Sequence, residues 1–346
     1  MMDNAIPMTD VQRDVPLAPL TTLGIGGPAR YFARAGSAGE ISQAIAWAKA
    51  NRQPLFVMSG GSNLLIADQG FPGLVLQIRL RGVKVESGAT VTAGAGERWD
   101  DFVQTAVANR WAGIECLSGI PGSVGATPIQ NVGAYGQEVS ETIVRVGVLD
   151  RATRQTMTLT NQECRFAYRS SRFKTSDRDR YVVISVTFKL GENGPATVKY
   201  PELRQYLEER GASLTDLQQV RDAVIAIRRR KGMVLDRNDP DTRSDGSFFM
   251  NPIISPAAFA KLGDMPNYPA GDEVKLSAAW LIEHAGFQKG FVHGNVGISS
   301  KHTLAIINRG GGTAREVREL VAMIQKAVRD RFGVELQPEP IFVGFK

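Results

Sequence analysis

The spacing of hydrophobic and polar residues predicts helices at several places along the chain. At 37–52, Ser37 can cap a helix with one apolar face, and Glu40, three residues later, would complete a capping box. Thr313 and Glu316 repeat this signature before a helix at 313–332, which Gly333 would end. Further helices are expected at about 98–110, 215–231, 255–263 and 277–285.

Short apolar runs bounded by turn residues predict the strands. We expect strands at 54–58, 74–78, 142–150, 155–160 and 181–190, and a hairpin over 84–97. The segment 334–345 predicts a strand pair broken at Pro338 and Pro340. The first ~80 residues would then contain a small β-α-β unit.

This order of elements indicates an α+β protein with mixed sheets. A Rossmann domain is not favoured, because no Gly cluster stands in a strand–GxGxxG–helix context. We expect the first 20 residues to form a loose arm. The charged segment 236–246, which contains Pro and Gly, is the strongest candidate for a linker.

Length and composition limit the class of protein. A chain of 346 residues is expected to form two or three domains. It has no apolar run near 18 residues and no basic segment followed by an apolar one at its start, so we expect neither a membrane span nor a signal peptide. Cys116 and Cys164 are 48 residues apart and no His lies at metal-ligand spacing, which favours a reducing cytoplasm and argues against a metal site or a disulfide scaffold.

The net charge of 41 − 35 = +6 suits nucleic acid or small anions. The densest basic run is Arg228, Arg229, Arg230 and Lys231. It is typical of a solvated helix end, but it could also bind RNA or a ligand that carries phosphate. No aromatic RNA-binding motif accompanies it.

Two Gly-rich segments are candidates for binding a pyrophosphate. Glycine lets the backbone N–H groups approach an anion closely, and both segments add hydroxyl or amide side chains. Since no Walker loop is present, together they favour a dinucleotide held in another way. The candidate residues are Ser59, Gly60, Gly61, Ser62 and Asn63 in the first segment, and Gly122, Ser123, Gly125, Ala126, Thr127, Gln130, Asn131 and Gly133 in the second.

Several sequence strings, in order and over nine-tenths of the chain, resemble one flavoenzyme family. They are GGSNLLI, GIPGSVGATPIQNVGAYGQE, CRFAYRSSRFK, GSFFMNP, KLSAAWLIEHAGFQKG and LQPEPIFVG. They are similar to type I UDP-N-acetylenolpyruvoylglucosamine reductases, which make UDP-N-acetylmuramate for peptidoglycan. The resemblance implies an FAD-binding fold of the vanillyl-alcohol-oxidase type in two subdomains, 1–80 and 81–231, and a C-terminal α/β substrate domain, 232–336, with 337–346 returning to the first subdomain.

The resemblance also implies the chemistry. FAD, bound non-covalently, would take hydride from NADPH and reduce the enolpyruvyl double bond, which also needs a proton donor and a cation at the substrate carboxylate. Ser247 matches the family's proton donor, Arg169 its active-site arginine and Glu339 its glutamate. Without the resemblance, these would be an ordinary turn serine, a surface arginine and a solvated carboxylate.

Other positions match the family's substrate contacts. They are Tyr135, Tyr200, Lys231, Asn251, Tyr268 and His302, of which Tyr200 would lie on a mobile loop. Met250 stands where we expected a basic residue, which weakens the assignment of local nucleotide contacts. We expect a monomeric enzyme. The rival readings are an oxidase of the same flavin fold, which would have no use for Ser247, and a basic RNA-binding protein.

Overall fold

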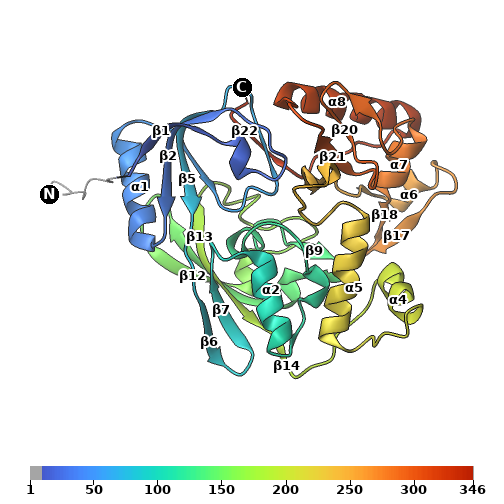
Figure 1. Ribbon diagram of the computed structural model, residues 1–346, viewed down its shortest axis with the longest axis horizontal. Coiled ribbons are helices and arrows are strands. Elements are labelled where there is room, and N and C mark those ends of the chain that lie inside the picture. Colours follow the sequence, from blue (N-terminus) through green and yellow to red (C-terminus); the bar gives the residue numbers. More distant parts are fainter. Residues whose placement is uncertain (1–9, 346) are drawn as a thin grey trace. The chain divides into compact units, whose positions relative to one another are not determined.

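The computed structural model describes residues 10–345, which form two compact units (Figure 1). The first contains the chain up to Val15 together with Ala29–Gly61 and Phe71–Arg229. The second contains Pro16–Pro28, Ser62–Gly70 and the chain from Arg230 onward. Each unit has its own apolar core.

The first unit begins with a four-stranded sheet in the order β1-β2-β5-β3. Its strands are β1 (Gln12–Pro16), β2 (Pro28–Ala35), β5 (Phe71–Ile78) and β3 (Leu55–Met58). β2 and β3 both run parallel to β5, and α1 (Ala38–Ala50) connects β2 to β3 in a β-α-β unit; β3 and β5 are the strands predicted at 54–58 and 74–78. The buried residues of α1, Ile41, Ala44, Ile45 and Ala48, form the apolar face that the spacing predicts.

An antiparallel sheet of five strands forms the rest of this unit's framework, in the order β12-β11-β13-β7-β6. These strands are β12 (Thr156–Thr160), β11 (Ile143–Asp150), β13 (Tyr181–Lys189), β7 (Thr90–Gly94) and β6 (Val83–Ser87). α2 (Trp99–Ala108) packs on it through Trp99 and Phe102, whose ring centroids lie 6.0 and 5.0 Å from that of Phe188 on β13. The sheet and helix thereby share one aromatic core.

Shorter elements complete the first unit. Two small strand pairs are β8 (Trp111–Ala112) with β14 (Gly191–Glu192), and β9 (Gly133–Ala134) with β10 (Gln137–Glu138). The single-turn 3-10 helices are η2 (Glu115–Leu117), η3 (Val124–Ala126) and η4 (Val139–Glu141). The α-helices are α3 (Asn161–Cys164), α4 (Pro201–Glu208) and α5 (Leu217–Arg230).

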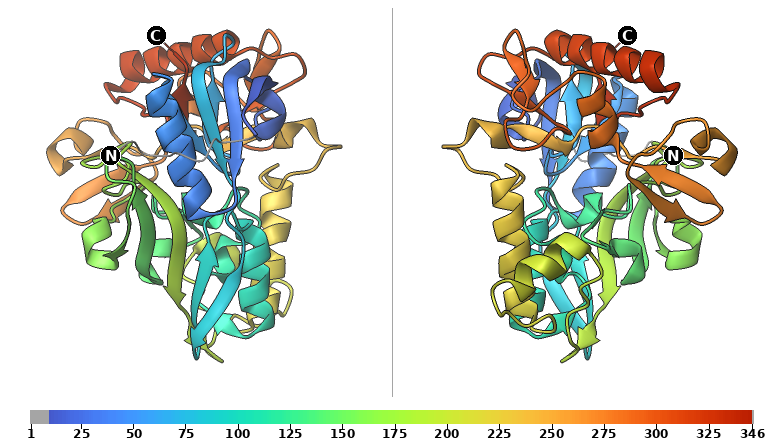
Figure 2. Two further views of the ribbon diagram at one scale, coloured as in Figure 1. Left: turned by 90° about the vertical axis from the view of Figure 1, so that its left-hand side faces the viewer. Right: turned by 90° about the vertical axis from the view of Figure 1, so that its right-hand side faces the viewer.

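The second unit is built from small sheets and the longest described helix, α8 (Ala314–Phe332), shown in Figure 2. Its sheets are β15-β21-β20-β19, β16-β18-β17 and the parallel pair β22-β4. The strands are β4 (Leu64–Ile66), β15 (Ser244–Ser247), β16 (Ile253–Ile254), β17 (Asn267–Ala270), β18 (Glu273–Leu276), β19 (Val292–His293), β20 (Val296–Ile298), β21 (Ala305–Asn308) and β22 (Ile341–Val343). The remaining helices are η1 (Ala18–Leu20), η5 (Pro240–Thr242), α6 (Pro256–Phe259) and α7 (Ala278–His284).

The helix caps agree with the sequence at α8 and differ at α1. Thr313 and Glu316 form the predicted capping box, and Gly333 ends α8 with φ +66°. At α1, Ser37 accepts the N–H of Glu40 as predicted. The Glu40 carboxylate, however, accepts the N–H of Gly36 at 2.6 Å rather than that of Ser37. The cap therefore extends one residue further out than a capping box.

Two loop predictions are wrong. Residues 1–9 of the expected arm lie outside the described residues, but Gln12–Pro16 form strand β1. The expected linker at 236–246 lies within the second unit, where Asp241 and Ser244 are buried. Asp241 is held by Ser300, whose N–H and hydroxyl donate to its two carboxylate oxygens at 3.0 and 2.6 Å. Charge on this segment therefore marks internal hydrogen bonding.

Candidate active site

The backbones of the two Gly-rich segments meet at Gly60 and Gly122 in the first unit. A Cβ on Gly60 would lie 2.7 Å from Gly122 Cα and 2.9 Å from its carbonyl carbon. These are backbone atoms that no rotamer change can move, so residue 60 must be glycine for this approach. The preceding residue, Ser59, accepts a hydrogen bond from the side-chain amide of Gln77 through its backbone carbonyl, at 3.3 Å.

The start of the second Gly-rich segment is buried and contains an unpaired polar atom. Ser123 is 4% exposed, and its hydroxyl oxygen has no hydrogen-bond partner among the described residues. Beside it, a Cβ on Gly125 would lie 2.5 Å from that of Ala95. Since a buried hydroxyl without a partner is costly, Ser123 is suited to a ligand oxygen.

The backbone amides that follow Ser123 already have partners. The N–H groups of Val124 and Gly125 donate to the backbone carbonyls of Glu97 and Ala95 at 2.9 Å. The N–H of Ala126 donates to the backbone carbonyl of Ser123 at 3.1 Å. The Thr127 hydroxyl donates to the Val124 carbonyl at 2.8 Å. The backbone amides of η3 are thus hydrogen-bonded within the protein, and these bonds hold the segment in place.

Asn131 ties the second Gly-rich segment to two others. Its side-chain amide donates to Glu138 at 2.7 Å and to the Ala167 carbonyl at 3.1 Å, and its amide oxygen accepts the N–H of Ser140 at 3.1 Å. Asn131 is 1% exposed and has a positive φ of 48°. In this structure the residue therefore shapes the loop that leads to Gly133.

Arg169 lies against that loop. Its Nη2 donates to the Gly133 carbonyl at 2.6 Å and its Nη1 to that of Asn131 at 3.5 Å. A Cβ on Gly133 would lie 3.1 Å from Nη1, so glycine makes room for the guanidinium. The structure thus brings together Arg169, Asn131 and Gly133, three residues that the sequence assigned to the site.

Two predicted substrate residues of the first unit also meet. The rings of Tyr135 and Tyr200 pack edge to face, with centroids 5.4 Å apart and planes at 89°. Tyr200 precedes α4 as its N-cap residue and is 40% exposed. Gly136 allows the contact, because a Cβ there would lie 2.9 Å from Lys199 Cβ. The two phenols therefore form one aromatic surface.

In the second unit, the segment that carries Ser247 pairs with the segment that carries Glu339. Ser247 ends β15 and pairs with Ala305 of β21. The next residue, Phe248, accepts the N–H of Glu339 at 2.8 Å through its carbonyl oxygen. Asn63 adds a bond from its side-chain amide to the Glu339 carbonyl at 3.3 Å. The backbone of Glu339 thus bonds to the residue that follows the candidate proton donor, although 92 residues separate Ser247 and Glu339 in sequence.

His302 completes this cluster. Its Nε2 lies 3.3 Å from Ser247 Oγ, and both side chains are half-buried. The other candidates of this unit lie on separate elements. Lys231 follows α5, Asn251 accepts the N–H of Ala278 at 3.0 Å at the start of α7, and Tyr268 is exposed on β17.

Sequence reasoning missed Asp245, two residues before Ser247. Its carboxyl is buried, Oδ1 accepts from the Thr22 hydroxyl at 3.3 Å, and Oδ2 has no partner among the described residues. Burial raises the pKa of Asp245 to about 8, against the opposing effect of hydrogen bonds from Thr22 and the Leu64 N–H. An aspartate between Ser and Gly reads as a turn residue, so its burial leaves no signal in the sequence.

The basic run at the end of α5 is not a uniformly solvated helix end. Arg229 and Arg230 are exposed, but Arg228 is buried, and burial lowers the pKa of its guanidinium. About two helical turns before Arg228, Arg221 donates to both carboxylate oxygens of Asp100 at 2.7 and 3.0 Å. Burial opposes ionisation of Asp100, yet the bonds from Arg221 and the Gly119 N–H lower its pKa. Two of the four arginines of α5, Arg221 and Arg228, are therefore buried.

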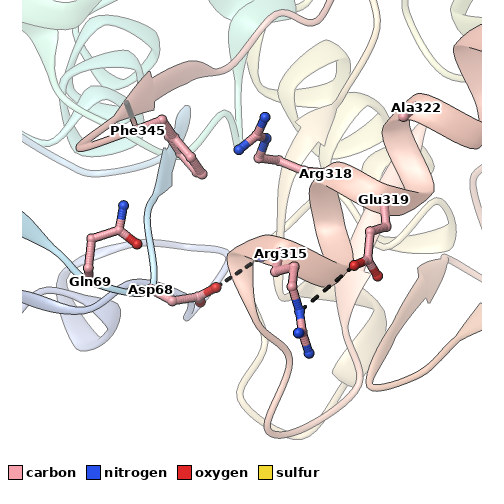
Figure 3. A pocket seen from close by; sticks show the side chains of 7 residues that line it. All are labelled: Asp68, Gln69, Arg315, Arg318, Glu319, Ala322 and Phe345. Carbon is pink, nitrogen blue, oxygen red and sulfur yellow. Dashed lines mark hydrogen bonds and ion pairs between the residues drawn. The ribbon is translucent and has the colours of Figure 1, made fainter.

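A surface cleft of about 460 Å³ lies at the start of α8 (Figure 3). Asp68 occupies the helix end by accepting the N–H groups of Ala314 and Arg315 at 2.7 and 3.0 Å. Arg318 lies over the Phe345 ring at 5.1 Å, and Glu319 pairs with Arg315 at 3.8 Å. The cleft's charges balance, and none of the candidate residues lines it.

Two features are absent from residues 10–345. No group of three or more His, Cys, Asp or Glu is arranged to hold a metal ion. None of the described helices is long and apolar enough to cross a membrane.

Comparison with known proteins agrees with this architecture. Residues 29–159 match the family model for an FAD binding domain, and residues 239–343 match the model described as UDP-N-acetylenolpyruvoylglucosamine reductase, C-terminal domain. The fold and site therefore define a flavoprotein in which an FAD-binding domain precedes a separate C-terminal domain. The expected fold class is confirmed.

Whole-chain relatives carry the same name. Proteins named UDP-N-acetylenolpyruvoylglucosamine reductase from Thermobifida fusca and Streptomyces avermitilis are 47% and 48% identical, over 97% and 96% of this chain and 99% and 94% of theirs. The crystal structure of the enzyme of that name from Thermus caldophilus has a TM-score of 0.68 at 26% identity, covering 96% of this chain and 99% of the other. The chain belongs to the UDP-N-acetylenolpyruvoylglucosamine reductase family.

Proposed function

We propose that this protein reduces the enolpyruvyl double bond of UDP-N-acetylglucosamine enolpyruvate, with NADPH as reductant, and so supplies UDP-N-acetylmuramate for peptidoglycan. Relatives of that name match the chain almost end to end. The observation that carries the proposal is the position of Ser247, whose hydroxyl lies beside His302 and next to the backbone contact of Phe248 with Glu339.

FAD fits the two Gly-rich segments, which begin at Ser59 and Gly122, as a non-covalent ligand. At Gly60 and Gly122 no side chain stands between the backbone and a ligand, and the Ser123 hydroxyl can donate to a phosphate oxygen. When bound, FAD accepts hydride from NADPH and supplies it to the double bond, which no side chain can do. We assign the same role in binding to Ser59, Gly61, Ser62, Asn63, Gly125, Ala126, Thr127, Gln130, Asn131 and Gly133.

Three side chains would act on the enolpyruvyl group. The Arg169 guanidinium can donate two parallel hydrogen bonds to the substrate carboxylate, where negative charge grows as hydride adds. Ser247 would give its hydroxyl proton to the second alkene carbon. The Glu339 carboxylate would orient the substrate beside that hydroxyl. Fixing the Arg169 side chain on Gly133 reduces the entropy lost when the substrate binds.

Contacts to the nucleotide would come from both charged and aromatic residues. Lys231 offers a cation for the diphosphate, while the Tyr135–Tyr200 pair offers phenol hydroxyls and ring faces. Asn251 uses its amide oxygen at α7 and keeps its NH₂ group for a ligand acceptor. Tyr268, exposed on β17, is the remaining assigned contact to the nucleotide.

We also infer a cytoplasmic monomer. NADPH and UDP-linked sugars are cytoplasmic compounds, and Cys116 and Cys164 are buried unpaired thiols whose pKa burial raises to about 12. Light scattering of the purified protein should give the mass of one chain, 37.6 kDa.

The proposal is tested by flavin colour under nitrogen. Purified protein should be yellow, NADPH should bleach it, and the enolpyruvyl substrate should restore the colour. UDP-N-acetylglucosamine, which lacks the enolpyruvyl group, is the control and should leave the protein bleached. Colourless protein that binds no FAD, or colour that returns equally fast with the control compound, would contradict the proposal.

A further inference from the structure

The contact between Ser247 and His302 is held by a short, well-bonded turn. The His302 N–H donates to Ser299 Oγ at 3.3 Å, and its carbonyl accepts the N–H of Ala305 at 3.0 Å. On the other side, the Phe248 N–H donates to the Leu304 carbonyl at 2.7 Å. The β15–β21 pairing holds the backbone of Ser247, and these bonds hold the backbone of His302, so the two side chains that meet at 3.3 Å come from well-bonded segments.

Charged neighbours stabilise the same turn and are paired among themselves. Lys301 binds Asp239 at 2.5 Å, and Ser300 donates to both carboxylate oxygens of Asp241. Thr303 donates to Glu283. The turn that carries His302 is therefore anchored by partners on both of its sides.

We propose that His302 is a positioning residue for Ser247, and that its Nε2–H donates a hydrogen bond to Ser247 Oγ. This inference rests on the proposed function. The sequence assigned His302 to substrate binding, whereas the contact points to a role exerted through the serine. Ser247 has only one hydroxyl hydrogen, so accepting from His302 leaves that hydrogen for the substrate.

The same bond would matter most during proton transfer. The O–H bond of Ser247 breaks as the new C–H bond forms on the substrate, and the electron pair stays on Oγ as an alkoxide. A fixed N–H donor stabilises charge that develops at that atom, and it costs no reorganisation at the moment of reaction. Water returns a proton to Oγ after the product leaves, and His302 keeps its own proton throughout.

Two substitutions separate donation from other roles. His302→Gln keeps an N–H close to the position of Nε2, while His302→Leu keeps the bulk without a donor. His284→Gln, at an exposed histidine of the same unit, is the matched control. Stopped-flow flavin absorbance gives the rates of the NADPH and enolpyruvyl half-reactions separately, and a substrate titration of the oxidised flavin spectrum gives Kd.

We expect His302→Leu to slow the enolpyruvyl half-reaction by about 10²-fold, as for loss of one oxyanion donor. His302→Gln should stay within about threefold of wild type. Neither should change the NADPH half-reaction or the substrate Kd. In a Ser247→Ala background, His302→Leu should cause no further loss, since the histidine acts only through the serine.

Several results would overturn this inference. They are an additive loss in the Ser247→Ala background, a weaker substrate Kd with an unchanged rate, and a His302→Gln variant as slow as His302→Leu. If His302→Leu does not fold, His302→Asn replaces it, because the shorter amide does not reach Oγ. A wild-type enzyme that the substrate fails to re-oxidise would instead contradict the proposed function, and the inference with it.

Discussion

The buried carboxyl of Asp245 predicts a pH-dependent stability that one substitution should remove. Its pKa is raised to about 8 in the folded protein, against 3.8 for the ordinary group. The folded state therefore holds one more proton than the unfolded state between about pH 4 and pH 8. The free energy of unfolding should fall as the pH rises through this range and level off above about pH 8.

The size of the effect follows from the difference in pKa. Each unit corresponds to about 1.36 kcal/mol, so raising the pH from 5 to 9 should remove about 4 kcal/mol of stability through this group. Asp245→Asn is neutral at every pH and should lack this loss. Any difference in how the amide pairs with Thr22 is independent of pH, so the change of stability with pH carries the test.

Urea unfolding at pH 5, 7 and 9, with the same excess of FAD, measures the effect. The stability of Asp245→Asn relative to wild type should rise by about 4 kcal/mol across this series. Asp272→Asn, at an exposed aspartate of the same unit, should show no such trend. Parallel stability curves for wild type and Asp245→Asn would refute the reasoning.

Three further predictions concern ligand binding. Gly60→Ala should lower the FAD content of the purified protein, because its Cβ would lie 2.7 Å from Gly122 Cα, whereas Gly39→Ala, with no atom closer than 3.8 Å, should not; equal flavin absorbance per chain would contradict this. Tyr200→Phe keeps the ring packing and removes one hydroxyl, so a substrate titration should give a Kd roughly 2- to 12-fold weaker, with normal NADPH bleaching; a loss of bleaching would exclude a substrate role. Arg169→Lys keeps the charge but not the fork, and should slow the enolpyruvyl half-reaction by about 10-fold or more while leaving the NADPH half-reaction unchanged; equal loss in both would indicate a role in folding.

Local signals in the sequence predicted most elements, because caps and periodicity act over a few residues. The Thr313–Glu316 box and Gly333 fix α8 at the expected limits. Strand β2 was missed, since Arg30 and Arg34 interrupt its apolar pattern. The linker prediction failed because the hydrogen bonds from Ser300 to Asp241 connect residues 59 positions apart.

The candidate site shows the same limit. Residue types and the family resemblance identified Ser247, Glu339 and Arg169, but their neighbours depend on strand pairing. The Ser247–His302 contact spans 55 positions, and the Glu339 N–H reaches Phe248 only because the C-terminal segment returns to β15. Burial of Asp245 and Arg228 is also a property of packing, and single-residue polarity predicts the opposite.

The role of Ser247 is tested most directly by timing the two half-reactions of Ser247→Ala by stopped-flow flavin absorbance. The variant should bind FAD and be bleached by NADPH at a near-normal rate. Its re-oxidation by the enolpyruvyl substrate should fall by at least the roughly 10²–10⁴-fold expected for loss of a general acid, and Ser247→Cys should recover part of this loss. Equal loss in both half-reactions, or no loss in either, would contradict the assignment of Ser247 as the proton donor.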